Sequence, residues 1–248
     1  MNRIIVFALM FFCMTMQIEA QTLSEEEVTA KMYQAFELNK AAKKAEALEL
    51  FLIVGENTKQ QRNEGERQVY VCSQTMACQC YELLGRYKEG YLLGKSLLQG
   101  KLNDTERKDV GHLYAMNGYM YACEFIQRDE KGRADYKRGR ELISEILPYS
   151  DGQVKEYAET KIPLSWYFEG AQYAMTQSYD EALSSYEEAL NGFRDLGRVS
   201  EEVDVLSGIA SVKAHLCKFD EAKRVYYQAF VLAHQNGKVN KQMDVLRE

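Results

Sequence analysis

The sequence contains little proline, histidine and tryptophan: its 248 residues include 2 Pro, 3 His and 1 Trp. Proline interrupts helices and central strands because it lacks a backbone N–H, so its scarcity leaves room for long helices and argues against a β fold with many turns. The hydrophobic fraction of 46% and the charged fraction of 27% are typical of an ordered globular protein. Composition therefore excludes a disordered or collagen-like chain and predicts an ordered, mainly helical one.

The chain also lacks an excess of basic residues. It carries 31 Lys and Arg against 37 Asp and Glu, a formal net charge of −6 with His counted as neutral. Proteins bind nucleic acids largely by neutralising phosphates with Lys and Arg, which this balance does not favour. We therefore predict no nucleic-acid partner.

A long apolar run occurs only at the start of the chain. Arg3 precedes the apolar run 4–16, and the small residue Ala20 stands just before Gln21. This order is typical of a secretory signal peptide, and the run is shorter than the roughly 20 residues that a membrane-spanning helix needs. We predict that residues 1–20 are cleaved from a mature domain of residues 21–248, which leaves no stable membrane span. A permanent membrane anchor is the weaker alternative.

The layout of this N-terminus also resembles that of a known class of exported proteins. The short basic start and the Ala20–Gln21 junction are similar to those of envelope proteins of the Bacteroidota. The resemblance is one of layout rather than of motif. It implies export to the periplasm of a Gram-negative bacterium.

Cysteines are few and give no metal-binding pattern. An odd number remains after cleavage, so they cannot all pair within one exported chain. Cys78 and Cys80 stand two residues apart and point in different directions on a helix, and no second pair or His ligand lies at metal-binding spacing. We expect no metal site and expect the cysteines to be small buried residues between helices. The five cysteines of the mature chain are Cys72, Cys78, Cys80, Cys123 and Cys217.

The sequence shows no catalytic constellation. The three histidines, His112, His215 and His234, are far apart and accompany no Ser or Cys in a recognisable nucleophile motif. Gly85 and Gly90 lack the Lys-Ser/Thr of a phosphate-binding loop. Acidic pairs fall at expected helix starts or outer faces, where the helix dipole favours them. We predict a non-enzymatic protein with no catalytic residues and no cofactor.

The second half of the chain contains an internal repeat. Large, small and aromatic residues recur in a fixed order, and Ala182 and Ala222 occupy equivalent positions 40 residues apart (222 − 182). This order resembles the tetratricopeptide repeat, a helix–turn–helix unit in which small residues let two helices approach closely. One copy is Trp166, Gly170, Tyr173, Ala182, Tyr186 and Ala189, and the next is Leu206, Ala210, Ala222, Tyr226 and Ala229.

The first half fits weaker copies of the same pattern. In the middle copy the small positions Gly118 and Gly139 lie 21 residues apart (139 − 118) instead of 12 (182 − 170), which predicts an exposed, longer turn within 124–135. We expect Pro148 to end a helix and Pro163 to begin the helix that carries Trp166. The other matching positions are Ala35, Ala47, Phe51 and Val54; Cys78, Tyr81, Tyr87, Gly90 and Leu97; and Tyr114, Tyr121, Ile143 and Ile146.

The resemblance implies an all-α fold: five tetratricopeptide-like hairpins over about residues 24–237, stacked as a right-handed α-solenoid and followed by a short C-terminal helix. A plain helical bundle is the alternative. In this family the first helix of each hairpin lines a concave groove that holds a partner. Transferring that register gives Thr75, Gln79, Glu82, His112, Tyr119, Cys123, Tyr167, Ala171, Met175, Ser211 and His215 as groove residues.

Aromatic anchors among a few polar groups suit an extended peptide or helix. The Lys and Asn cluster with which chaperone-binding members clamp a C-terminal carboxylate is missing, which disfavours that role. We therefore predict a scaffold or adaptor that binds a protein or peptide in the cell envelope. The alternative is the sensory input module of a membrane signalling regulator, of the kinase or transcription-factor type, whose output domain is absent from this sequence.

Overall fold

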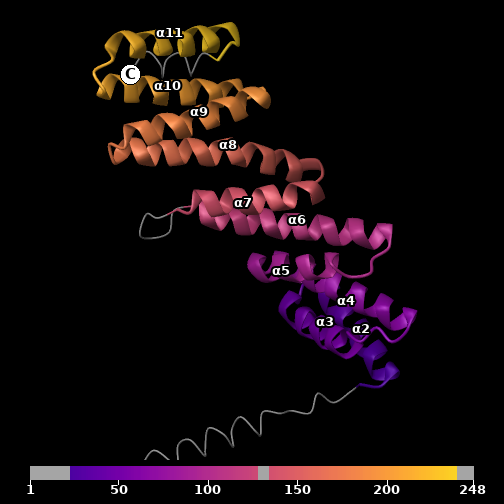
Figure 1. Ribbon diagram of the computed structural model, residues 1–248. Coiled ribbons are helices and arrows are strands. Elements are labelled where there is room, and N and C mark those ends of the chain that lie inside the picture. The colour runs from indigo at the N-terminus through magenta and orange to yellow at the C-terminus, as the bar shows by residue number, and fades with distance from the viewer. Residues whose placement is uncertain (1–22, 128–133, 239–248) are drawn as a thin grey trace, which may run out of the picture. The chain divides into compact units, whose positions relative to one another are not determined.

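The computed structural model describes residues 23–127 and 134–238, which fold into α-helices without any strand (Figure 1). The predicted signal peptide, the charged part of the predicted long turn and the predicted short C-terminal helix lie outside these residues. The helices are α2 (Glu25–Lys40), α3 (Lys44–Thr58), α4 (Glu64–Leu83), α5 (Tyr87–Leu98), α6 (Asp104–Ile126), α7 (Tyr136–Ile146), α8 (Gly152–Met175), α9 (Tyr179–Asp195), α10 (Val199–His215) and α11 (Phe219–Gln235), with a 3-10 turn at Leu147–Tyr149.

The chain divides into two compact units between Leu84 and Gly85. The first unit contains α2, α3 and α4, and α3 packs against both of its neighbours. Its core forms around Phe51, which is fully buried and meets Phe36 edge-on with ring centroids 5.5 Å apart. Gly55 leaves room for the Gln74 side chain of α4, because a Cβ at Gly55 would lie 1.7 Å from the Gln74 Nε2.

The second unit contains α5 to α11, and each helix packs against the next one in the chain. In addition, α8 contacts both α6 and α10, so it lies between these two alternate helices. Two apolar clusters fill the unit, one around Tyr114 and Ile143 and the other around Tyr186, Phe193 and Leu206. The all-α fold of tetratricopeptide-like hairpins predicted from the sequence is confirmed.

Local sequence explains where several helices begin. Ser24 and Asn103 each accept a hydrogen bond from the backbone N–H three residues on, and the glutamates there, Glu27 and Glu106, accept one in return. These capping boxes satisfy N–H groups that have no partner inside the helix.

Small repeat residues lie where two helices come closest. A Cβ at Gly170 of α8 would approach Tyr186 of α9 to 2.9 Å and the backbone oxygen of Ala182 to 3.2 Å. A Cβ at Gly139 of α7 would approach Ile126 of α6 to 2.5 Å. Gly90 packs against Asn117, and Gly118 against Ile146 and Tyr91, in the same manner.

Two details of the predicted helix boundaries are wrong. Pro163 lies inside α8 rather than at its start, because the helix already begins after Asp151. Its ring packs closely against Gly192 of α9, where a Cβ would lie 2.8 Å from the Pro163 Cβ, so the absence of a side chain at Gly192 leaves room for the ring. In addition, α6 continues to Ile126, so the start of the predicted turn is helical. Pro148 follows the end of α7, as expected.

Candidate partner-binding groove

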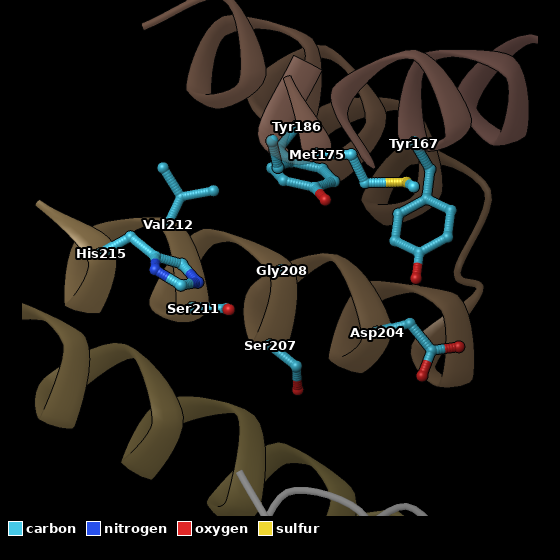
Figure 2. Close-up of a pocket in the computed structure, with 10 residues that line it drawn as sticks. Tyr167, Met175, Tyr186, Asp204, Ser207, Gly208, Ser211, Val212 and His215 are labelled. Carbon is cyan, nitrogen blue, oxygen red and sulfur yellow. The ribbon is translucent and has the colours of Figure 1, made fainter. Parts of the chain in front are cut away.

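A pocket of about 430 Å³ lies between α8 and α10, the first helices of the last two hairpins (Figure 2). Tyr186 of α9 also contributes to it. The pocket is lined by Tyr167, Ala174, Met175, Tyr186, Asp204, Ser207, Gly208, Ser211, Val212 and His215.

The two walls of the pocket differ in chemistry. The α10 wall presents Asp204, Ser207, Ser211 and His215, which are spaced by three or four residues and therefore share one helix face. This wall offers a carboxylate, two hydroxyls and an imidazole. The α8 wall is aromatic and apolar, with Tyr167 and Ala174 beside Met175, whose side chain is 75% exposed.

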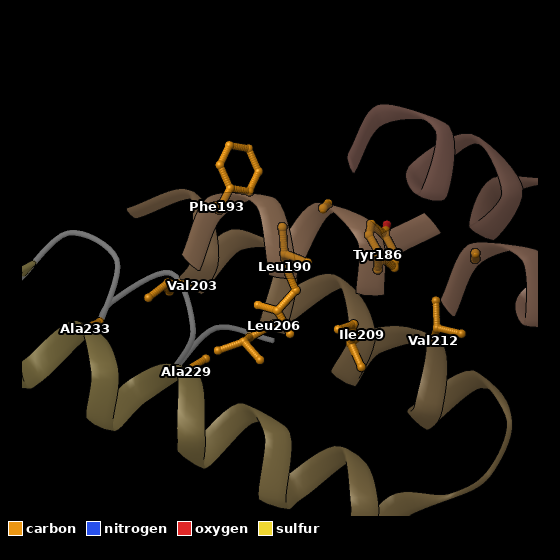
Figure 3. Packing of buried hydrophobic residues seen from close by; sticks show 12 residues of the cluster. Tyr186, Leu190, Phe193, Val203, Leu206, Ile209, Val212, Ala229 and Ala233 are labelled. Atoms are coloured by element: carbon orange, nitrogen blue, oxygen red, sulfur yellow. The ribbon is translucent and has the colours of Figure 1, made fainter. Parts of the chain in front are cut away.

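Tyr186 forms the floor of the pocket between two glycines. A Cβ at Gly208 of α10 would approach its ring to 2.9 Å, the same distance as at Gly170 of α8, so both helices close on the ring only because neither residue has a side chain. The ring also packs among Ile209 and Val212 in the buried cluster (Figure 3). Burial, with a smaller effect of the Tyr167 hydroxyl, raises the pKa of the Tyr186 phenol to about 12. Tyr186 therefore stays neutral at physiological pH.

His215 closes one end of the pocket. Its ring stacks on Tyr179 of α9 with centroids 5.9 Å apart and an interplanar angle of 7°. Figure 2 shows Tyr167 and Asp204 at the opposite end. The pocket therefore has an aromatic and acidic end and an imidazole end, joined by Ser207 and Ser211.

The structure brings four of the sequence-predicted groove residues together: Tyr167, Met175, Ser211 and His215 line this one pocket. Asp204, Ser207 and Gly208 also line it, although they are not among the predicted groove residues. The signal was available, because Asp204, Ser207 and Gly208 precede Ser211 at helical spacing.

Other predicted groove residues of the second unit lie outside this pocket. Tyr119 of α6 stacks on Tyr157 of α8 with centroids 6.3 Å apart. His112 of α6 pairs through its Nδ1 with the carboxylate of Asp151 at 3.0 Å. The first contact joins α6 to α8, and the second joins α6 to Asp151, the N-cap of α8. These residues therefore lie between α6 and α8, not in the pocket between α8 and α10.

Cys123 of α6 is buried and Ala171 of α8 is half-buried, and neither lines the pocket. The remaining predicted groove residues, Thr75, Gln79 and Glu82, lie on α4 in the first unit. All three are half-buried. The Thr75 hydroxyl donates to the carbonyl oxygen of Val71 at 2.7 Å, a bond within its own helix. They remain predictions as partner-binding residues.

Glu145 of α7 forms a second polar cluster in the second unit. Its carboxylate accepts hydrogen bonds from Tyr114 at 2.7 Å and Tyr91 at 2.9 Å and pairs with Lys95 at 2.6 Å. Burial acts to raise the pKa of Glu145, but these three donors outweigh it and hold the pKa below the ordinary value of 4.5. The carboxylate therefore ties α7 to α5 and α6 rather than offering a reactive group.

Cysteines and acidic residues form no metal centre in the part of the chain that the structure describes: no group of three or more His, Cys, Asp or Glu is placed to hold an ion. The five described cysteines are free thiols. Cys78, Cys80 and Cys123 are buried as expected, and burial raises the pKa of Cys78 to about 12. The expectation is wrong for Cys72 and Cys217, which are exposed. Within residues 23–127 and 134–238, no helix is both long and apolar enough to cross a membrane.

Comparison with known proteins finds similarity in structure alone. No family model and no curated protein matches the chain. The apo form of RapI aligns over 86% of this chain and 72% of its own, at 14% identity and a TM-score of 0.36. A thermophilic TPR protein of Thermus thermophilus, TTC0263, aligns over 89% of this chain and 100% of its own, at 15% identity and a TM-score of 0.34. Because both scores are low, the fold assignment rests on the helix pairs described above, and no function is transferred.

Proposed function

We propose that this protein is a non-enzymatic scaffold that binds a protein or peptide through the pocket between α8 and α10. One observation carries the proposal: Tyr167, Met175, Ser211 and His215, selected by the repeat register, line a single pocket. An exposed apolar anchor beside hydroxyl and imidazole groups suits a peptide, which needs burial for affinity and directional hydrogen bonds for register.

We further propose that the protein acts in the cell envelope, in the periplasm of a Gram-negative bacterium. The arrangement of Arg3, the apolar run 4–16 and Ala20 supports export. A sensory input module of a membrane regulator would use the same surface for its ligand. The two functions therefore differ in what occupies the pocket.

Site-specific photocrosslinking tests the scaffold. A benzophenone amino acid replaces Met175, which lines the pocket and is 75% exposed, and a matched control replaces Tyr227 of α11, which is 68% exposed and lies outside the pocket. In native envelopes we expect a discrete crosslinked protein from position 175 but not from position 227.

A second comparison assigns the crosslink to the pocket itself. Adding Tyr167→Ala and Ser211→Ala removes one group from each wall and is expected to abolish the crosslink from position 175. A crosslink that survives both changes, or equal crosslinking from positions 175 and 227, would contradict the proposed site. Absence of any protein crosslink would favour the sensory alternative.

A further inference from the structure

The helix α8 presents apolar side chains outward as well as toward the core. Val154 and Ala158 are buried, yet Tyr157, Phe168 and Met175 of the same helix are 52%, 39% and 75% exposed. A surface helix usually presents polar residues to solvent, because water solvates them. Large exposed apolar side chains that gather on one face instead mark a surface that binds a partner.

The outward residues of α8 follow a heptad spacing. Six of them succeed one another at alternating intervals of four and three residues and range from half-buried to exposed. We call this set the α8 stripe: Tyr157, Lys161, Leu164, Phe168, Ala171 and Met175. Residues at this spacing share one helix face, and in coiled coils they form the seam that contacts a second helix. The stripe spans 18 residues (175 − 157), or about 27 Å of helix.

Lys161 is the single charged residue of the α8 stripe. It is half-buried and lies near Cys123 of α6: burial raises the pKa of the Cys123 thiol, and the positive charge of Lys161 acts in the opposite direction. Lys155, on another face of α8, lies 3.9 Å from the carboxylate of Glu159, whereas no carboxylate of the described residues pairs with Lys161. An ammonium group in this setting favours a negative group in whatever covers the stripe.

The α8 stripe reaches both places in which predicted groove residues lie. At its C-terminal end, Met175 also lines the pocket between α8 and α10. At its N-terminal end, Tyr157 stacks on Tyr119 of α6 with ring centroids 6.3 Å apart. A ligand that lies along the stripe therefore meets the pocket at one end and α6 at the other.

We propose that the partner presents an amphipathic α-helix that lies along the α8 stripe, with apolar side chains at heptad spacing and a Glu or Asp opposite Lys161. The inference rests on the proposed function, since it specifies the peptide that the groove binds. A helix fits because its side chains return to one face every seven residues, about 10.5 Å, as those of the stripe do. In an extended peptide they return about every 6.6 Å. One charged residue in such a seam sets the register of the two helices.

Charge favours this partner over a second copy of the chain. The α8 stripe contains no Asp or Glu, so neither parallel nor antiparallel packing of two stripes would pair Lys161 with a carboxylate. In the parallel arrangement the two Lys161 side chains would face each other and repel. An acidic residue must therefore come from a different sequence.

Three capped peptides of about 21 residues, or three heptads, test the inference. All have Leu at the heptad positions and Ala or Gln elsewhere. The first carries Glu at the central heptad position, the second carries Lys there, and the third combines the Glu with a Pro outside the Leu face, which breaks the helix. Binding of each fluorescein-labelled peptide to the full-length protein is measured by anisotropy, at peptide concentrations too low for self-association. We expect the Glu peptide to bind about five- to tenfold more tightly than the Lys peptide, and the Pro peptide not to bind detectably.

Matched variants assign the binding to the α8 stripe. Lys161→Glu should reverse the preference, so that the Lys peptide binds more tightly, and unfolding cannot produce such a gain of affinity. Lys223→Glu reverses a charge at an exposed position of α11 and should leave the preference unchanged. Phe168→Ser should weaken binding of the Glu peptide about tenfold, whereas Phe219→Ser, at the exposed start of α11, should not.

The outcomes separate this inference from the proposed function. Binding of the Pro peptide as tight as that of the Glu peptide would overturn recognition of a helix, and equal affinities for the Glu and Lys peptides would overturn the pairing with Lys161. If no peptide binds, the inference is also overturned, and the crosslink from position 175 decides the proposed function independently. Self-association of the protein that Phe168→Ser abolishes, without peptide binding, would assign the stripe to a second copy and overturn the inference as well.

Discussion

The guanidinium of Arg140 lies 3.4 Å from the centroid of the Trp166 ring, which joins α7 of one hairpin to α8 of the next. The same guanidinium pairs with Glu169 at 2.7 Å and donates to the Ser165 hydroxyl at 3.3 Å, and the residue is only 9% exposed. A buried charge of this kind is tolerated because its partners replace the lost water. The contact between these hairpins is therefore polar as well as apolar.

Arg140→Met is expected to destabilise the protein by about 2–4 kcal/mol, because it leaves the carboxylate of Glu169 half-buried without its partner. Urea unfolding followed by tryptophan fluorescence measures the change, and Trp166 is the only tryptophan in the chain. Arg138→Met is the matched control. Arg138 pairs with Glu141 on an exposed face, so its loss should cost less than about 0.5 kcal/mol.

A second variant distinguishes the charge from the bulk of the arginine. Adding Glu169→Gln to Arg140→Met removes the unpaired carboxylate and should recover part of the lost stability. If the double variant is as unstable as the single one, packing on Trp166 rather than the ion pair accounts for the role of Arg140.

Gly170→Ala is expected to destabilise the protein by about 1–3 kcal/mol, because the added methyl group has no room between α8 and α9. The new Cβ would lie 2.9 Å from Tyr186 and 3.2 Å from the fixed backbone oxygen of Ala182. Gly111→Ala in α6 is the control, since its Cβ would meet Tyr149 at an ordinary 3.4 Å. Thermal unfolding followed by circular dichroism should show a lower melting temperature for Gly170→Ala and an equal or higher one for Gly111→Ala.

The hairpins could be predicted from the sequence because their signal is local. Gly170 and Ala182 face each other across one turn, and their spacing is fixed by two helices and a short loop. Trp166 is a repeat position, but Arg140, which contacts it from the preceding hairpin, is not, so no spacing rule identifies this contact. The position of Pro163 was predicted wrongly because proline is favoured in the first turn of a helix, and the space that Gly192 leaves for its ring is a tertiary feature that the local sequence does not show.

Part of the candidate site could also be predicted from the local repeat pattern. The repeat register selected Tyr167 and His215, which the structure places in one pocket. Asp204 and Gly208 belong to that pocket through contacts between successive hairpins. Helical spacing from Ser211 could have placed Gly208 on this face of α10, but the reason for a glycine there, the ring of Tyr186 from the preceding hairpin, is not indicated by the sequence of α10 alone.

The proposed export makes a prediction about the N-terminus of the mature protein. We expect the protein recovered from cells to begin at Gln21, since Ala20 provides the small residue that signal peptidase requires before the cleaved bond. Mass spectrometry of the intact protein measures this directly. Ala20→Leu should block cleavage and retain the precursor, whereas Ala30→Leu on the exposed face of α2 should not. A mature protein that still begins at Met1 would contradict the proposed signal peptide.

Glu145 should make stability depend on pH in a defined direction. Its pKa lies below 4.5 in the folded protein, so its carboxylate stabilises the fold above that value, and the contribution is lost as the pH falls through the lower, folded pKa. The side chain is 37% exposed, so solvent screening reduces the effect, and we expect Glu145→Gln to cost about 1 kcal/mol at neutral pH. The difference from the wild type should disappear in acid.

Urea unfolding at a series of pH values measures this difference. Glu141→Gln is the control, because Glu141 lies on the same helix in an exposed pair with Arg138 and should change stability little at any pH. A Glu145→Gln effect that stays constant from neutral to acidic pH would show that shape, not charge, matters at this position. Loss of the effect in acid would instead show that the ionised carboxylate, held by Tyr91, Tyr114 and Lys95, fastens α7 to α5 and α6.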